Sequence, residues 1–260
     1  MSNHTFEYVN GQNVFNYIKN KRARGPLHFT LIDPDKQTPE QAAELALKAK
    51  KMGTDAIMVG GSQPSQVIYL DETVKQIKEK TNLPVILFPS THAALSKQAD
   101  AVFFMSLFNS RSPQYLIEEQ LRGSVIINNY GLEPLSMAYL IIESGSLSSA
   151  AWGGDVKPIP RDKSAFVVGY ALTAKYFGMK FIYLEAGSGA ELSVPPEMVD
   201  AVKKSVGDDV LIIVGGGIRD DITANEKIQA GADIIVTGTI AEDNPVMFSK
   251  IIAAIKHKTF

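Results

Sequence analysis

Two Gly-rich turns near the end of the chain have the composition of a phosphate-binding site. The apolar run 210–214 is followed by one further residue and then by Gly216 and Gly217. The run 233–237 is followed by Gly238 and Thr239. Glycine lets a backbone approach a phosphate closely, and the N–H groups of a helix start point at the anion. A glycine run also forms ordinary tight turns. Two such turns, one strand and one helix apart, favour phosphate binding over that simpler interpretation.

Asp33 and Ser62 are candidate metal ligands, because each follows an apolar run, 27–32 and 55–60 respectively. Carboxylate and hydroxyl oxygens suit Mg²⁺, which keeps several waters and takes substrate phosphates as further ligands. The sequence Asp-Pro-Asp is also a common turn in which side chains cap backbone N–H groups. The residue types therefore leave a magnesium site and a structural turn as alternatives.

Glu185 stands at the end of the apolar run 180–184, where a carboxylate is placed to accept a proton from a substrate hydroxyl. The alternative is a structural role, in which the same carboxylate accepts backbone amides of the next turn. No apolar run ends in a lysine placed as a Schiff-base nucleophile. This absence argues against an aldolase mechanism.

The elements that must position these residues are short apolar runs alternating with longer helical patterns, which is typical of a parallel α/β fold. Eight such runs in 260 residues suit a closed barrel of roughly 250 residues. The predicted fold is one α/β domain over residues 1–260, a (β/α)8 TIM barrel with an N-terminal helical extension at 1–26. The predicted strands are 27–32, 55–60, 84–88, 101–105, 137–142, 180–184, 210–214 and 233–237.

One unit is irregular, because about twelve residues separate the third and fourth runs, with room for at most a short helix at 91–99. A crossover normally needs at least ~10–12 residues. We therefore expect the third helix to be short or replaced by irregular structure. The apolar bulk of Phe88 and of 101–108 then either fills the core or lines a groove for a hydrocarbon ligand. The Gly/Ser/Pro-rich segment 144–160 is predicted to be a long loop, a common form of active-site lid.

Composition excludes several classes of protein. Lys and Arg total 26 against 28 for Asp and Glu, which gives no basic excess for nucleic acid. Without cysteine there are no disulfides and no thiolate sites. No run reaches the ~20 apolar residues of a membrane span, so a cytoplasmic protein is expected. The cationic run 19–24 is either a solvated helix end or a weak, transient contact with anionic membrane lipid.

Five segments, HFTLIDPDK, DAIMVGGS, FIYLEAGSG, VGGGIRD and VTGT, resemble in order and spacing those of the geranylgeranylglyceryl phosphate synthases, especially the archaeal-type group found also in some bacteria. The resemblance runs from Leu27 to Glu242. It implies a barrel without the third helix and a Mg²⁺-dependent prenyl transfer. In that reaction the 3-hydroxyl of sn-glycerol 1-phosphate attacks C1 of geranylgeranyl diphosphate and displaces diphosphate.

The resemblance also implies site residues. Asp33 and Ser62 would ligate Mg²⁺, and Glu185 and Asp33 would be catalytic. The shorter bacterial group has a lysine where this chain has Leu31, so that contact is not carried over. Barrels of this kind often self-associate, and a homo-oligomer is expected. The residues expected to hold glycerol phosphate are Tyr183, Leu184, Glu185, Ala186, Gly187, Ser188, Gly189, Gly216, Gly217, Gly238 and Thr239.

Three other functions stay open. The same reaction could use a prenyl chain of different length. An isomerase or lyase acting on a small phosphorylated metabolite would use Glu185 as its base and need no lipid groove. A prenyl-phosphate carrier would need the groove but not Glu185.

Overall fold

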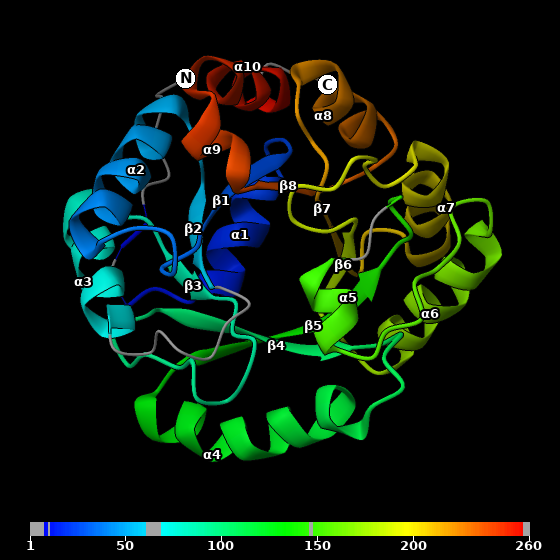
Figure 1. Ribbon diagram of the computed structural model, residues 1–260, viewed down its shortest axis with the longest axis horizontal. Helices are drawn as coiled ribbons and strands as arrows, with labels where there is room; N and C mark the ends of the chain where they lie inside the picture. The colour runs from blue at the N-terminus through cyan, green and yellow to red at the C-terminus, as the bar shows by residue number, and fades with distance from the viewer. Residues whose placement is uncertain (1–7, 10, 61–68, 146–147, 257–260) are drawn as a thin grey trace.

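Eight parallel strands close into a barrel in chain order, and β8 pairs with β1 (Figure 1). The computed structural model describes residues 8–9, 11–60, 69–145 and 148–256. The predicted (β/α)8 fold is confirmed, and every predicted strand is present. The strands are β1 Leu27–Ile32, β2 Ala56–Val59, β3 Val85–Leu87, β4 Ala101–Leu107, β5 Glu133–Ile141, β6 Phe181–Glu185, β7 Leu211–Gly215 and β8 Ile234–Thr237.

The largest shift in a strand boundary is at β5, which begins four residues before the predicted 137. The reason is its partner: all seven residues of β4 pair with β5, from Ala101 opposite Glu133 to Leu107 opposite Tyr139. The N-terminal half of β5 has a weak apolar pattern, with Glu133, Pro134 and Ser136. Pairing with β4 therefore extends the strand beyond what its own residues indicate.

Helices surround the barrel and follow the boundary signals of the sequence. Thr38 caps α2 in a reciprocal capping box with Gln41, and Gly53 ends that helix at φ 106°. Within the described residues, no helix is long and apolar enough to cross a bilayer. The helices are α1 Val14–Arg22, α2 Pro39–Met52, α3 Leu70–Thr81, α4 Glu119–Tyr130 after a π-helical turn at Gln114–Glu118, α5 Ser149–Gly153, α6 Ser164–Tyr176, α7 Pro196–Val206, α8 Asp221–Gln229, α9 Thr239–Asp243 and α10 Pro245–Lys256.

The helix that would follow β3, the third βα unit of the barrel, is absent, as predicted. Residues 88–100, all of them described, contain turns and bends only. The loop predicted at 144–160 is partly wrong, because it contains the short helix α5. Ser148 caps this helix, its hydroxyl accepting the N–H of Ala151 at 3.2 Å. A serine cap is one of the strongest local helix signals, and it outweighs the Gly-rich composition around it.

The core has two layers because strand side chains alternate between the inside and the outside of the barrel. Inside, Phe103 and Phe181 pack edge to face, with ring centroids 5.5 Å apart. Helix α1 lies across the N-terminal end of the barrel and adds Tyr17 and Ile18 to this inner layer (Figure 1). The outer layer lies between strands and helices and includes Ile182 and its neighbours.

Buried aspartates brace the N-terminal end of the barrel at three places. Each immediately precedes or starts a strand and accepts an N–H from the strand before it: Asp55 from His28 at 2.9 Å, Asp100 from Val85 and Asp233 from Ile212, both at 2.8 Å. This end of a TIM barrel characteristically serves stability.

The cationic run 19–24 supplies part of this bracing. Lys21 bonds to Asp55 at 3.0 Å, and Arg22 bonds to Asp233 at 2.7 Å. Two of the four cations are therefore held by carboxylates that are at most 4% exposed. The run is in part structural, which neither of the two interpretations from sequence anticipated.

Substitution of Asp233 tests this bracing. Asp233→Asn should lower the free energy of unfolding by about 1–3 kcal/mol, the usual cost of impairing a buried hydrogen bond to a charged group. The control is Asp208→Asn, which removes a 96%-exposed carboxylate from the same Lys203 and should change stability little. Urea denaturation measures both. Equal losses would mean that Asp233 acts only as one more surface charge.

Candidate active site

A cavity of 740 Å³ opens at the C-terminal end of the barrel, where the strand-end turns converge. Ten of the predicted site residues line it, on turns after β1, β6, β7 and β8 or at the ends of those strands. Ser62 lies outside the described residues. The ten are Asp33, Tyr183, Glu185, Gly187, Ser188, Gly189, Gly216, Gly217, Gly238 and Thr239.

Leu184 and Ala186 do not line this cavity, and their part in holding glycerol phosphate stays a prediction. Both side chains are fully buried in the outer core layer, between the strands and the helices. The physical reason is the alternation along β6: Tyr183 and Glu185 face the barrel interior, so their neighbours face out. A motif carried over as a continuous segment overlooks this alternation.

The turns after β7 and β8, where phosphate binding is predicted, lie together at one corner of the cavity, called the phosphate corner below. Gly216 has φ 79°, and a Cβ there would lie 2.3 Å from Oε1 of Glu185, so only glycine fits. Gly238 directly precedes the short helix α9, and Thr239 and Ile240 of its first turn line the cavity. TIM barrels characteristically bind phosphate between these two turns and the N-terminus of such a short helix.

Arg219 ties the phosphate corner to the turn after β6, and sequence reasoning did not single it out. Its guanidinium donates to the carbonyl oxygens of Gly189 and Ala190 at 3.0 and 3.1 Å, and the residue lines the cavity. The available signal was its place in the sequence, two residues after the glycine run. A cation there adds positive charge to the corner where phosphate binding is predicted.

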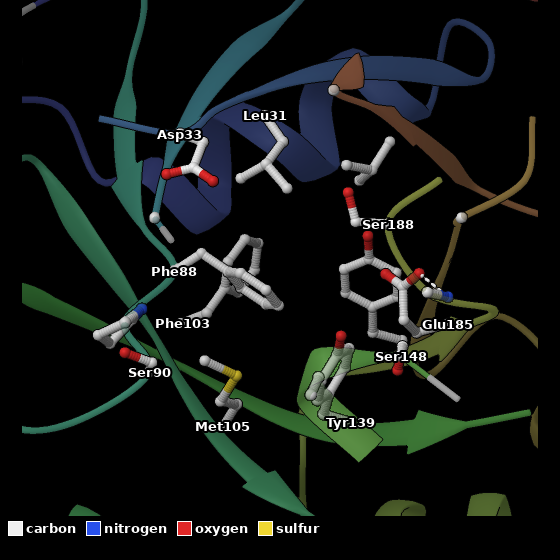
Figure 2. Close-up of a pocket in the computed structure, with 18 of the residues that line it drawn as sticks. Leu31, Asp33, Phe88, Ser90, Phe103, Met105, Tyr139, Ser148, Glu185 and Ser188 are labelled. Carbon is white, nitrogen blue, oxygen red and sulfur yellow. Dashed lines mark hydrogen bonds between the residues drawn. The ribbon is translucent and has the colours of Figure 1, made fainter. Parts of the chain in front are cut away.

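Glu185 ends β6 and is 7% exposed. Its Oε1 accepts the N–H of Gly187 at 2.5 Å (Figure 2). Burial raises the pKa of its carboxyl group above the ordinary glutamate value. Hydrogen bonds from the N–H of Gly187 and from the hydroxyls of Tyr183 and Tyr139 act in the opposite direction. Glu185 thus fills the structural role left open by its sequence and also lines the cavity.

Tyr139 and Tyr183 complete the surroundings of this carboxylate. Their rings meet edge to face with centroids 5.2 Å apart. Burial, followed by the charge of Glu185, raises the pKa of both hydroxyls well above 10, so they stay protonated and act as donors. Tyr139 was not predicted; its inward position follows from the alternation along β5, in which Leu135 and Met137 also face the interior.

Asp33 lies across the cavity from Glu185 (Figure 2). Its Oδ1 accepts the N–H of Asp35 at 3.0 Å, so the turn-capping interpretation is correct for one oxygen. The residue is half-buried and lines the cavity. In the described part of the chain, no three acidic or histidine side chains gather to hold a metal ion by themselves. A cation at Asp33 would therefore need oxygen ligands from a bound substrate.

The cavity continues into an apolar arm at the place where the third helix is missing. Phe88, Phe103 and Met105 line it from inside the barrel (Figure 2), and Phe104 lines it from the outer face of β4. Leu95, Gly123 and Ile127 complete its walls. The apolar bulk of β3 and β4 thus fills the core and also lines a cavity; that this cavity holds a hydrocarbon stays a prediction.

A polar pair lies along this arm, and nothing in the sequence indicated it. Nδ1 of His92 lies 2.7 Å from Oε2 of Glu119, and the same oxygen accepts the backbone N–H of His92 at 2.8 Å. This pair joins the loop that replaces the third helix to α4. Both residues line the cavity.

Comparison with known proteins agrees with this geometry. The profile of the PcrB family matches residues 16–258. Geranylgeranylglyceryl phosphate synthase of Thermococcus kodakarensis is 53% identical over 229 residues, covering 88% of this chain and 89% of that protein. The synthase of Methanosarcina acetivorans is 54% identical over 235 residues, covering 89% and 94%.

A solved structure of a relative has a similar fold. The crystal structure of (S)-3-O-geranylgeranylglyceryl phosphate synthase from Thermoplasma acidophilum, in complex with sn-glycerol-1-phosphate, superposes with a TM-score of 0.89 at 40% identity. The match covers 95% of this chain and all of that one. This chain belongs to the PcrB family, among the geranylgeranylglyceryl phosphate synthases.

Proposed function

We propose that the protein forms the ether bond between sn-glycerol 1-phosphate and geranylgeranyl diphosphate. The observation that carries this function is one cavity that joins a phosphate corner, a buried carboxylate and an apolar arm. The relatives described above are named geranylgeranylglyceryl phosphate synthases, and the structure of one of them is a complex with sn-glycerol-1-phosphate. An isomerase or lyase of small metabolites would leave the apolar arm without a use.

The two substrates would occupy different parts of the cavity. Glycerol phosphate would lie at the corner of Gly216, Gly217 and Gly238, with its 3-hydroxyl near Glu185. Glu185 accepts the hydroxyl proton as the oxygen forms its bond to C1 of the prenyl chain. The bond from C1 to the diphosphate oxygen breaks, and diphosphate leaves with the electron pair. Holding both reactants in one cavity replaces a bimolecular encounter by an oriented contact.

The donor atoms at Asp33 fit Mg²⁺. The ion prefers oxygen ligands and commonly uses one or two carboxylates together with waters and substrate phosphates. Asp33 offers a half-buried carboxylate that has one oxygen bonded to the Asp35 N–H, and the described residues form no separate metal-binding cluster. Asp33 would hold the ion with Ser62, and when bound it would neutralise charge on the diphosphate.

Three further expectations stay predictions: self-association, a cytoplasmic location and a transient membrane contact. For self-association, a relevant feature is an exposed apolar stripe on α4, formed by Leu121 and Val125 with Ile117 one turn before. Such a stripe is typical of an interaction surface. The charge balance makes nucleic acid an unsuitable partner.

A competition assay tests the reaction and the chain length together. The enzyme is given labelled sn-glycerol 1-phosphate and an equal mixture of C10, C20 and C35 prenyl diphosphates, and the organic extract is analysed by mass spectrometry. Each buried CH₂ contributes about 0.8 kcal/mol, so the C20 product should greatly exceed C10. Little C35 product is expected if Leu95 and Ile127, which line the arm, close its far end. No extractable label would contradict a prenyltransferase; binding without turnover would indicate a carrier.

Replacing Asp33 tests the metal site. Asp33→Asn keeps the shape of the side chain and removes its charge, so most turnover should be lost while the melting temperature is kept. The control, Asp162→Asn, alters a carboxylate that is 71% exposed and should be silent. Activity is measured against Mg²⁺ concentration. A variant with normal activity at limiting Mg²⁺ would exclude Asp33 as a ligand.

Replacing Glu185 tests the proton acceptor. Glu185→Gln should lower kcat by roughly 10²–10⁴, the usual loss of a general base. Because burial raises the pKa of Glu185, the carboxyl stays protonated to higher pH than usual. In the unmodified enzyme kcat should therefore fall on acidification at a pH above the ordinary glutamate pKa, and the variant should lose this dependence. Glu191→Gln, exposed on the same loop, is the control; a normal kcat for Glu185→Gln would leave that residue a structural role.

A further inference from the structure

A second cavity, of 1140 Å³, lies at the N-terminal end of the barrel. It is opposite the candidate active site at the C-terminal end, which is called the mouth below. Helices α1, α2, α3 and α10 and the segments leading into β1, β2 and β3 line it. The chain as a whole carries a net charge of -2, yet this lining is strongly basic. Against two carboxylates, Asp55 and Glu79, it sets six cations: Lys21, Arg24, Lys50, Lys75, Lys78 and Lys256.

Bracing of the barrel accounts for three of these cations. Lys21 and Lys256 both bond to Asp55, and Lys78 bonds to Asp100 at 2.8 Å. The Asp55 carboxylate is 4% exposed and also accepts the N–H of His28. Two ammonium groups share this one carboxylate, so a positive charge stays uncompensated at the cavity wall.

Lys50 and Lys75 have no bracing role. Both are exposed, and neither forms an ion pair with any residue that the structure describes. They come from α2 and α3, which pack side by side, and they line the same cavity. Like charges gathered around one hollow repel each other, and a multivalent anion between them would remove this repulsion.

We propose that this cavity binds a multivalent phosphate-bearing anion. Lysine ammonium groups contact phosphate oxygens as compact point charges, and several around one hollow suit a chain of phosphates better than a single carboxylate. A lipid headgroup carries the same chemistry. However, a membrane on this face would hold the mouth of the barrel away from the bilayer that carries prenyl chains. The geometry therefore favours a free anion. This choice rests on the proposed function, whereas the anion site itself does not.

Hydrogen exchange with mass spectrometry, using inorganic triphosphate as the probe, locates the site on the intact protein. Triphosphate should protect peptides from 17–27, 50–56 and 75–84. The Kd of triphosphate, obtained from how this protection depends on its concentration, should rise about five- to thirtyfold in the variant Lys50→Gln/Lys75→Gln. The reason is that two exposed charge pairs with the anion are lost. Prenyl transfer by this variant should be unchanged, because neither lysine belongs to the mouth.

A matched control separates a specific site from general attraction. Lys48→Gln/Lys250→Gln removes the same charge from two exposed lysines outside the cavity and should alter the Kd less than twofold. An equal loss in both variants would overturn the proposal. So would protection confined to the mouth peptides 183–189 and 215–220. Sedimentation with anionic phospholipid vesicles through Lys50 and Lys75, without binding of free triphosphate, would assign the lysines to a membrane surface instead.

Discussion

Closure of the barrel between β1 and β8 is the constraint on which the site depends. The pairing of Leu27 with Ile234 and of Thr30 with Thr237 joins segments some 207 residues apart, the difference of the paired numbers. It brings the turn that carries Asp33 beside the turn that carries Gly238. An open sheet of the same strands would leave these two turns at opposite edges. The facing arrangement of Asp33 and Glu185 across one mouth is thus a property of the closed ring (Figure 2).

The absence of a helix between β3 and β4 leaves room for the apolar arm that we propose holds the prenyl chain. In a complete barrel a helix between β3 and β4 would cover the outer face of β4, where Phe104 lies half-buried. Here residues 88–100 form turns, and α4 with Leu95 encloses a space instead of filling it. The loop is fastened to α4 by the contact between His92 and Glu119. The apolar arm is therefore bounded by β4 on one side and by α4, with the loop fastened to it, on the other.

Much of this architecture could be predicted from sequence because its signals are local. Apolar runs, the Thr38-Pro39 helix start and the short spacing between β3 and β4 each depend on few neighbouring residues. The start of β5 could not be predicted, since pairing with β4 and not its own composition makes Glu133 to Ser136 a strand. The same limit explains the site. Turn residues such as Asp33 and Gly216 can be recognised from the residues next to them in sequence. The site positions of Tyr139 and Arg219 and the His92–Glu119 contact depend on segments distant in the chain.

The close approach of Gly216 to Glu185 has a consequence for how this enzyme can evolve. Oε1 of Glu185 occupies the space that any side chain at position 216 would need. One substitution at that position would disturb both the proposed phosphate corner and the proposed proton acceptor. If both proposals hold, affinity for the polar substrate and the chemical step share a single mutational target at position 216, whereas residues of the apolar arm can vary without displacing Glu185.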